Sequence, residues 1–268
     1  MNDAPLGVFD SGLGGLTVAR ALFERLPRES VIYFGDTARV PYGPKSAETV
    51  RRYSSEILKF LLERGVKMVV VACNTSTAHA LEHLRKIAPV PVIGVIEPGA
   101  RAAVAASNGG TVGVIGTVGT ITSGAYQRAI AALDPNVRVE GVPCPLFVPL
   151  VEEGWLDHPA TELIAREYLT PLTCAPIDAV VLGCTHYPLL KPVLGRVLGP
   201  GVTLIDSSGE TAKAVQEALE SKTLQAGAGS NPTHHFVVSD DAPRFRKVGA
   251  TFLGDRLRDT EVEVVSLG

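Results

Sequence analysis

Val69–Thr77 reads VVVACNTST, an apolar run that ends in a thiol followed by hydrogen-bonding side chains. Consecutive β-branched valines are typical of a strand buried on both faces of a parallel sheet, where no polar alternation is needed. In open α/β sheets, ligands bind just beyond the carboxyl ends of the strands, which is where Cys73 stands. The stretch therefore predicts a parallel α/β fold with a thiol at its ligand-binding edge.

A second stretch of the same design lies in the other half of the chain. Ala179–Pro188 reads AVVLGCTHYP, so Cys184 also ends an apolar run and is followed by a threonine and a histidine. Gly7–Gly12 and Gly113–Val118 match as well, because each passes from a strand through a glycine-containing turn into a helix. We expect an α/β fold of two pseudo-symmetric domains with mainly parallel sheets and the active site in the cleft between them.

The repeat and the element pattern suggest where the domains divide. We expect residues 1–97 to form the first α/β domain, completed by residues 208–268, and residues 98–207 to form the second. Glycine, proline and polar clusters separate eight helical patterns, over residues 16–26, 46–64, 76–87, 100–106, 123–133, 159–168, 211–219 and 243–253. Residues 221–233 have the composition of a flexible linker.

Composition narrows the function classes. The 268 residues are 46% hydrophobic and 20% charged with a net charge of −3, which gives no electrostatic reason to expect nucleic acid or a membrane surface. No apolar run is long enough to span a bilayer, and the first residues lack the features of a signal peptide. We therefore expect a cytoplasmic protein whose thiols stay reduced. Two of the four cysteines, Cys144 and Cys174, are interpreted as buried packing residues.

Two other motifs suggest cofactors and are set aside. Ser11–Gly15 is a glycine-rich turn between a strand and a helix, but its glycines are misspaced for the dinucleotide fingerprint. His79 and His83 lie four residues apart on a predicted helix, yet no third ligand sits beside them, whereas zinc sites need three or four. We expect no metal here and interpret both histidines as solvent-facing.

Two opposed thiols fit the inversion of a stereocentre. Removing a proton from one face and returning it to the other requires a base and an acid on opposite sides. Asp10, His186 and Glu152 are candidates for tuning the thiols or relaying protons. Polar donors are available to stabilise a carbanion, namely Ser11, Asn74, Thr75, Thr117 and Thr185. No cofactor-binding lysine motif is evident, so we expect a reaction without a cofactor.

The motifs FDSGLGGLTV, YFGDTARVPYG, ACNTSTA, VVLGCTHYPLL and IDSSGETA occur in this order. Together they resemble the glutamate racemases of the cofactor-independent aspartate/glutamate racemase superfamily, over roughly Pro5–Ala218. The resemblance implies a two-domain fold with the site between the domains. It also implies interconversion of L- and D-glutamate that supplies D-glutamate for peptidoglycan.

The resemblance further implies residue roles. Cys73 matches the cysteine that takes the α-proton from D-glutamate, and Cys184 matches the one that takes it from L-glutamate. Asp10 and His186 match assisting acid/base residues, and Glu152 matches a carboxylate near the second cysteine. The segments that match substrate-holding residues are Asp10–Ser11, Tyr42–Gly43, Asn74–Thr75 and Thr185–His186, and Thr117 is a further candidate.

Three alternatives remain open at this point. The first is an aspartate racemase of the same superfamily, because side-chain length is selected by pocket shape. A cysteine hydrolase would use Cys184 and His186 but would leave Cys73 unexplained. An α/β binding protein would use both cysteines only for packing. We also expect a homodimer whose ligand is a small molecule, with no need for nucleic acid.

Overall fold

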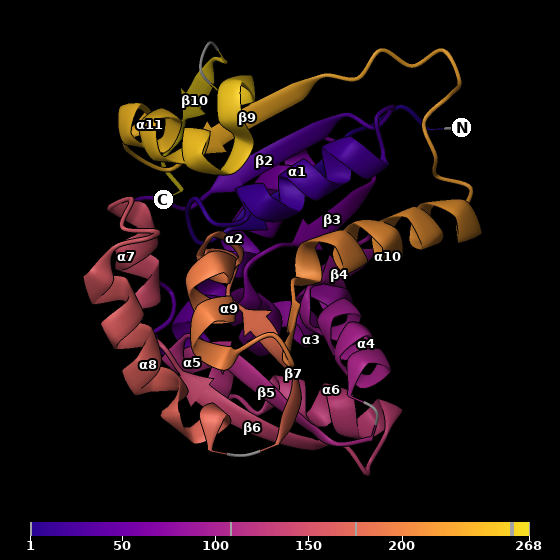
Figure 1. The fold of residues 1–268 in the computed structure, drawn as a ribbon. Helices are drawn as coiled ribbons and strands as arrows, with labels where there is room; N and C mark the ends of the chain where they lie inside the picture. The colour runs from indigo at the N-terminus through magenta and orange to yellow at the C-terminus, as the bar shows by residue number, and fades with distance from the viewer. Residues whose placement is uncertain (1, 108, 175, 258–259, 268) are drawn as a thin grey trace.

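The fold consists of two parallel β-sheets, each covered by helices on both faces, in a computed structural model that describes residues 2–107, 109–174, 176–257 and 260–267. The larger sheet has the order β10-β9-β2-β1-β3-β4, and the smaller has the order β6-β5-β7-β8. Figure 1 shows the larger sheet in the upper part of the molecule and the smaller sheet below it. Every strand pair in both sheets is parallel.

The strands are short. Those of the larger sheet are β1 (Leu6–Asp10), β2 (Val31–Gly35), β3 (Met68–Val71), β4 (Val92–Gly94), β9 (His234–Val238) and β10 (Val262–Val264). Those of the smaller sheet are β5 (Thr111–Gly116), β6 (Arg138–Pro143), β7 (Ile177–Gly183) and β8 (Thr203–Ile205). All residues of β1, β2 and β3 are buried, as their apolar sequences predict for strands with two covered faces.

The helices follow the strands in a regular α/β alternation. The first six are α1 (Leu16–Arg25), α2 (Ala47–Glu63), α3 (Asn74–Ile87), α4 (Ile96–Ala106), α5 (Val118–Thr122) and α6 (Ala125–Leu133). The next five are α7 (Phe147–Glu152), α8 (Pro159–Thr173), α9 (Lys191–Leu198), α10 (Ser207–Ser221) and α11 (Ala242–Leu253). Two 3₁₀ turns complete the set, η1 (Tyr187–Leu190) and η2 (Gly254–Leu257).

The two sheets repeat one strand order. Around its central strand, the larger sheet runs β2-β1-β3-β4, and the smaller runs β6-β5-β7-β8 in the corresponding positions. The expected pseudo-symmetric α/β fold is therefore confirmed. The strands that correspond in the two sheets include β3 and β7, which lead into Cys73 and Cys184. We propose that the two sheets mark the two domains, divided near residues 97 and 207 as expected above.

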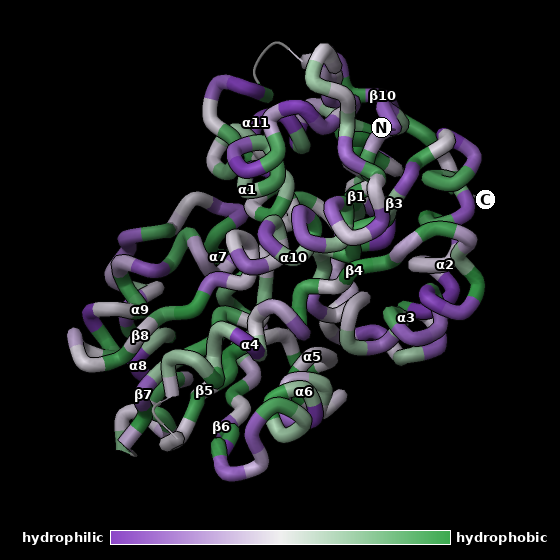
Figure 2. The backbone as a smooth tube through the Cα atoms, turned by 90° about the vertical axis from the view of Figure 1, so that its right-hand side faces the viewer, coloured by the Kyte–Doolittle hydropathy of each residue, from purple (hydrophilic) through white to green (hydrophobic). Residues whose placement is uncertain are grey.

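The core is layered because successive strand residues point to opposite faces. One face of the larger sheet packs against α2 and α3, and one face of the smaller sheet packs against α4 and α6. The remaining faces share one continuous apolar cluster with α1, α8, α9 and α11. Figure 2 shows hydrophobic segments running through the interior and hydrophilic ones on the outer turns. None of the helices in the described part of the chain has both the length and the apolarity that a bilayer span requires.

Several helices differ from the expected ones. α3 begins at Asn74 because Cys73 itself is the N-cap, and its sulfur accepts a hydrogen bond from the Ser76 N–H at 3.4 Å. α4 begins at Ile96 rather than at residue 100, since a proline in the first turn gives up an N–H that has no partner inside the helix. α5, α7 and α9 lie outside the helical patterns expected from the sequence.

The expectation for Cys174 is wrong. This residue caps the C-terminus of α8 and is exposed to solvent. Cys144 is buried, as expected.

Candidate active site

The two strand-end cysteines are both buried at the start of a helical segment. Cys73 follows β3 and caps α3, while Cys184 follows β7 and precedes η1. Their side chains are nearly inaccessible, with 5% and 6% of their surface exposed. Both therefore stand at the carboxyl edge of a parallel sheet, where α/β proteins bind ligands.

Asp10 and Ser11, at the end of β1, connect the two cysteine segments. The Cys73 thiol lies 3.6 Å from the Ser11 hydroxyl. The Asp10 carboxylate accepts hydrogen bonds from the Gly12 N–H at 2.9 Å and from the hydroxyl of Thr185, the neighbour of Cys184, at 3.4 Å. One short segment therefore contacts both thiol-bearing loops and brings them to a single site.

Gly14 allows this close approach. A Cβ atom at this position would lie 2.2 Å from the Thr185 hydroxyl and 2.4 Å from Nδ1 of His186, closer than real contacts allow. The glycine-rich turn after β1 therefore packs directly against the segment Cys184–His186, the second cysteine segment. The close packing explains why the turn is rich in glycine, although its glycine spacing does not match a dinucleotide-binding motif.

His186 occupies the centre of a chain of charged and polar groups. Its Nδ1 lies 3.9 Å from the sulfur of Cys184, and its Nε2 lies 3.1 Å from Oε1 of Glu152 at the end of α7. The other carboxylate oxygen of Glu152 accepts a hydrogen bond from Arg244 of α11 at 3.1 Å. The predicted residues Cys184, His186 and Glu152 thus lie together, and Arg244 is an additional member that sequence reasoning missed.

Burial and neighbouring charges perturb the titration of these groups. Burial alone would lower the pKa of His186, but its bonds to Cys184 and Glu152 and the charge of Asp10 raise that pKa to about 10. For Glu152, burial acts to raise the pKa, and the cations His186 and Arg244 outweigh it and lower the pKa below its usual value. His186 is therefore an imidazolium at neutral pH, and its positive charge lies beside the sulfur of Cys184.

The first cysteine has the opposite environment. Burial and the adjacent Asp10 charge raise the pKa of Cys73 to about 11, against the weaker effects of its bonds to Ser76 and Ser11. Burial also raises the pKa of Asp10, and the His186 charge offsets part of this rise. At neutral pH Cys73 is consequently a thiol. The site therefore has a protonated thiol at Cys73 and an imidazolium beside the sulfur of Cys184.

Replacing His186 with asparagine is expected to remove a pH-dependent contribution to stability. Because the fold raises the pKa of His186 to about 10, the protonated ring stabilises the fold fully below its unfolded pKa of about 6.5. That contribution is lost as the pH rises through about 10. Urea unfolding of both proteins at several pH values should show the largest difference in unfolding free energy at the acidic end. A difference that does not change with pH would contradict the assignment.

A cluster of hydroxyl groups joins the helix after Cys73 to the helix after β5. The Thr75 hydroxyl lies 2.9 Å from that of Thr117 and 3.2 Å from that of Thr120. Beside it, Oδ1 of Asn74 accepts a hydrogen bond from the Tyr126 hydroxyl at 2.7 Å. The Asn74 amide nitrogen is buried and has no partner among the described residues, so it has donors left for a ligand.

Tyr42 and Gly43 support the wall of the site. The Tyr42 hydroxyl donates to Asp36, and its ring is buried, so its side chain fixes the loop between β2 and α2. The Gly43 carbonyl accepts a hydrogen bond from the Gly119 N–H at 2.9 Å, which ties this loop to α5. A cavity of about 370 Å³ opens beside the loop, and its lining includes Gly43, Thr117 and Glu152. Three predicted site residues therefore border one opening.

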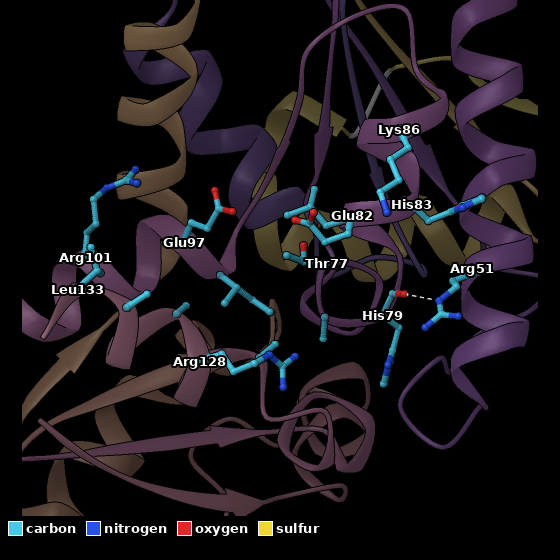
Figure 3. A pocket seen from close by; sticks show the side chains of 16 residues that line it. Arg51, Thr77, His79, Glu82, His83, Lys86, Glu97, Arg101, Arg128 and Leu133 are labelled. Atoms are coloured by element: carbon cyan, nitrogen blue, oxygen red, sulfur yellow. Dashed lines mark hydrogen bonds between the residues drawn. The ribbon is translucent and has the colours of Figure 1, made fainter. Parts of the chain in front are cut away.

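The larger cavity, of about 760 Å³, lies elsewhere and contains neither cysteine. Figure 3 shows charged side chains around it, from α3, α4, α6 and the start of α2. His79 and His83 are on its wall, but the described residues contain no group of three or more side chains suited to a metal ion. His83 is exposed, as expected, whereas His79 is half-buried. The chemistry available at the thiols, rather than cavity size, places the candidate active site at Cys73 and Cys184.

Two matching α/β units, with a buried thiol at the corresponding strand end of each and acid/base groups between them, have the arrangement of a two-base isomerase. The chain belongs to the Asp/Glu/Hydantoin racemase family, whose model matches residues 11–215. It is therefore an amino-acid racemase.

Relatives at high identity agree. The glutamate racemase of Geobacter metallireducens is 54% identical over 254 residues, covering 95% of this chain and 94% of that protein. The glutamate racemase of Neisseria meningitidis serogroup A is 50% identical, covering 98% of this chain and 97% of that protein. The crystal structure of glutamate racemase RacE1 from Bacillus anthracis superposes with a TM-score of 0.95 at 41% identity, over 100% of this chain and 99% of that one.

Proposed function

We propose that the protein is a glutamate racemase that interconverts L- and D-glutamate without a cofactor. The observation that carries this proposal is the pair of buried strand-end thiols, linked through Asp10 and Ser11, with the His186 ring beside the second of them. The substrate is taken from the relatives. Among them, the glutamate racemase of Francisella tularensis, with a TM-score of 0.93 and 41% identity over 100% of this chain and 99% of that one, was crystallised with D-glutamate.

In the proposed reaction, Cys184 removes the α-proton of L-glutamate and the Cys73 thiol delivers a proton to the opposite face. The carbon–hydrogen bond breaks on one face and a new one forms on the other, so the product is D-glutamate. Cys73 is left as the thiolate and Cys184 as the thiol, which is the state that accepts D-glutamate in the reverse direction. His186, held by Glu152, places its positive charge beside the sulfur of Cys184, and Asp10 is a candidate to relay a proton beside Cys73.

The donors around the thiols are proposed to hold the substrate. Asn74 has a free amide group, and Thr75 and Thr117 present hydroxyls at the starts of α3 and α5. The Ser11 hydroxyl lies against the Cys73 thiol, and Thr185, next to Cys184, is bonded to Asp10. These groups suit the carboxylates and the amino group of an amino acid, and they can stabilise the carbanion as it forms.

Two alternative activities are tested by the racemisation assay described below. Aspartate racemisation would follow from a shorter pocket, whereas the relatives from Geobacter metallireducens, Syntrophus aciditrophicus and Neisseria meningitidis, at 50% identity or more, are glutamate racemases. A cysteine hydrolase would use Cys184 with His186, but it gives no role to the buried thiol of Cys73 or to the contact between Thr185 and Asp10.

We also propose a cytoplasmic homodimer that supplies D-glutamate for peptidoglycan.

The purified protein, without added cofactor, is expected to racemise L-glutamate in D2O. Circular dichroism should report the loss of optical activity, and proton NMR should report replacement of the α-proton by deuterium. Because the equilibrium constant of a racemisation is one, the same end point should be reached from D-glutamate. Failure to change either signal would overturn the proposal, and faster turnover of aspartate would favour the alternative racemase.

A further inference from the structure

We propose that Arg244 of α11 is a positioning residue for the second thiol, acting by holding the Glu152 carboxylate against His186. This inference rests on the proposed racemase function for its catalytic consequence, but its effect on His186 can be measured without turnover. Arg244 does not touch either cysteine. It acts through Glu152 and His186, in a chain that runs from the protein surface to the sulfur of Cys184.

Among the described residues, each carboxylate oxygen of Glu152 has a single hydrogen-bond partner. Oε1 lies 3.1 Å from Nε2 of His186, and Oε2 lies 3.1 Å from Nη2 of Arg244. The Glu152 side chain is 14% exposed, so water can offer little replacement for a lost partner. With both bonds in place the carboxylate cannot rotate away from the imidazolium. Without Arg244, only the bond to His186 orients it.

The backbone of Arg244 is anchored at the start of α11. It lies in the first turn of α11, where its backbone N–H donates to the side chain of Asp241, the N-cap, at 3.0 Å. The neighbouring Phe245 is buried in the core and anchors this turn. On the same helix, Phe252 packs edge-on against the His186 ring, with centroids 5.6 Å apart. One helix therefore supports His186 both directly and through Glu152.

The contact also crosses between the two parts of the fold. α11 follows β9, a strand of the larger sheet, whereas α7, which ends at Glu152, lies between β6 and β7 of the smaller sheet. Figure 1 shows α7 directly below α11. The ion pair thus fixes the acid/base group of one half of the site from an element of the other half. We infer that the position of α11 and the orientation of His186 beside Cys184 are coupled.

An exposed ion pair by itself contributes little to stability, and the Arg244 side chain is 53% exposed. The predicted effect therefore concerns the orientation and charge of the site. The titratable groups facing His186 are Cys184, Glu152 and Asp10, and those facing Glu152 are His186 and Arg244. Loss of the Arg244 charge by itself would raise the pKa of His186, because a cation bound to Glu152 competes with the imidazolium. If Arg244 orients Glu152, its removal lets the carboxylate turn away from Nε2 of His186, and His186 should then lose its proton at lower pH.

The test compares Arg244→Gln with Arg246→Ala. Arg246 is an exposed cation two residues further along α11, so the control removes a charge from the same helix. We expect Arg244→Gln to lower kcat about five-fold, the size of a modest ion-pair effect, with KM nearly unchanged. The alkaline limb of the pH–rate profile should move to lower pH. Arg244→Lys should restore part of the rate and of the profile, and Arg246→Ala should match the parent protein.

A second readout does not depend on activity. NMR titration of the histidine rings, with His186 assigned by its loss in His186→Asn, should show a lower pKa for His186 in Arg244→Gln. If the parent protein does not racemise glutamate, the proposed function fails while this titration still tests the role of Arg244. If Arg244→Gln raises the pKa of His186, leaves both the His186 titration and the pH–rate profile unchanged, or lowers only the unfolding temperature, the positioning role is overturned.

Discussion

Replacing either Cys73 or Cys184 with alanine is expected to lower the rate of glutamate racemisation by at least about a thousand-fold, within the range that a general acid or base contributes. In the proposed mechanism each thiol serves as the base in one direction and as the acid in the other, so removal of one should block inversion from both enantiomers. Because the equilibrium constant is one, kcat/KM must fall equally in the two directions. Circular dichroism assays started from L- and D-glutamate measure both rates.

The two variants should nevertheless differ in proton exchange. In Cys184→Ala the remaining Cys73 faces the α-proton of D-glutamate, so D-glutamate should exchange its α-proton with D2O without inversion. In Cys73→Ala the same should hold for L-glutamate. Cys174→Ala, which changes an exposed cysteine outside the site, is the control and should keep the full rate. A near-full racemisation rate in either active-site variant would contradict the two-base scheme.

The architecture was predictable from sequence because buried parallel strands have a distinctive composition. The apolar runs before Cys73 and Cys184 are buried on both faces, as β3 and β7. The strand order around β1 is repeated around β5, which the matching glycine turns had indicated. Long-range pairing needed no separate signal here, since an α/β alternation with short connections leaves few possible topologies.

Helix starts were less predictable because their caps are unusual. Cysteine is an uncommon N-cap, so no capping signal in the sequence indicated that α3 begins at Asn74. Pro98 and Gly99 resemble a break but lie within the first turns of α4. α5 and α7 have five and six residues, too few to show a helical period. Cys174 was misjudged because the exposure of a single residue after a helix has no sequence signature.

The candidate site was predictable where motif residues adjoin a cysteine or a glycine turn. Asp10, Ser11, Thr185 and His186 follow strand ends, and the structure brings them together. Arg244 carries no such signal, because it lies in an amphipathic helix far along the chain and meets Glu152 only through the tertiary fold. The hydroxyl bonds of Thr120 were missed for the same reason. Charge pairing between distant elements cannot be read from a single sequence.

Replacing Gly14 with alanine is expected to lower racemisation about a hundred-fold, because a displacement of about 1 Å in catalytic geometry costs that much. The added Cβ would lie 2.2 Å from the Thr185 hydroxyl and 2.4 Å from Nδ1 of His186. Both groups belong to the segment that holds Cys184, so relief of the overlap must move this segment away from Asp10. The contact of Thr185 with Asp10 and the approach of His186 to the Cys184 sulfur would be lost together.

A second glycine provides the matched control. A Cβ at Gly195, inside α9, meets no atom within 4 Å, and alanine there should stabilise the helix by about 1 kcal/mol with an unchanged rate. For Gly14→Ala, steady-state kinetics measure the loss of rate, and the NMR titration of His186 should show its pKa moving towards the ordinary value as its bond to Cys184 breaks. A folded Gly14→Ala protein with a native rate and a native His186 titration would show that the second cysteine segment does not depend on its packing against the glycine turn. That outcome would mean that the contact of Thr185 with Asp10 is not needed to position Cys184. The environments of the two thiols would then be set independently of each other.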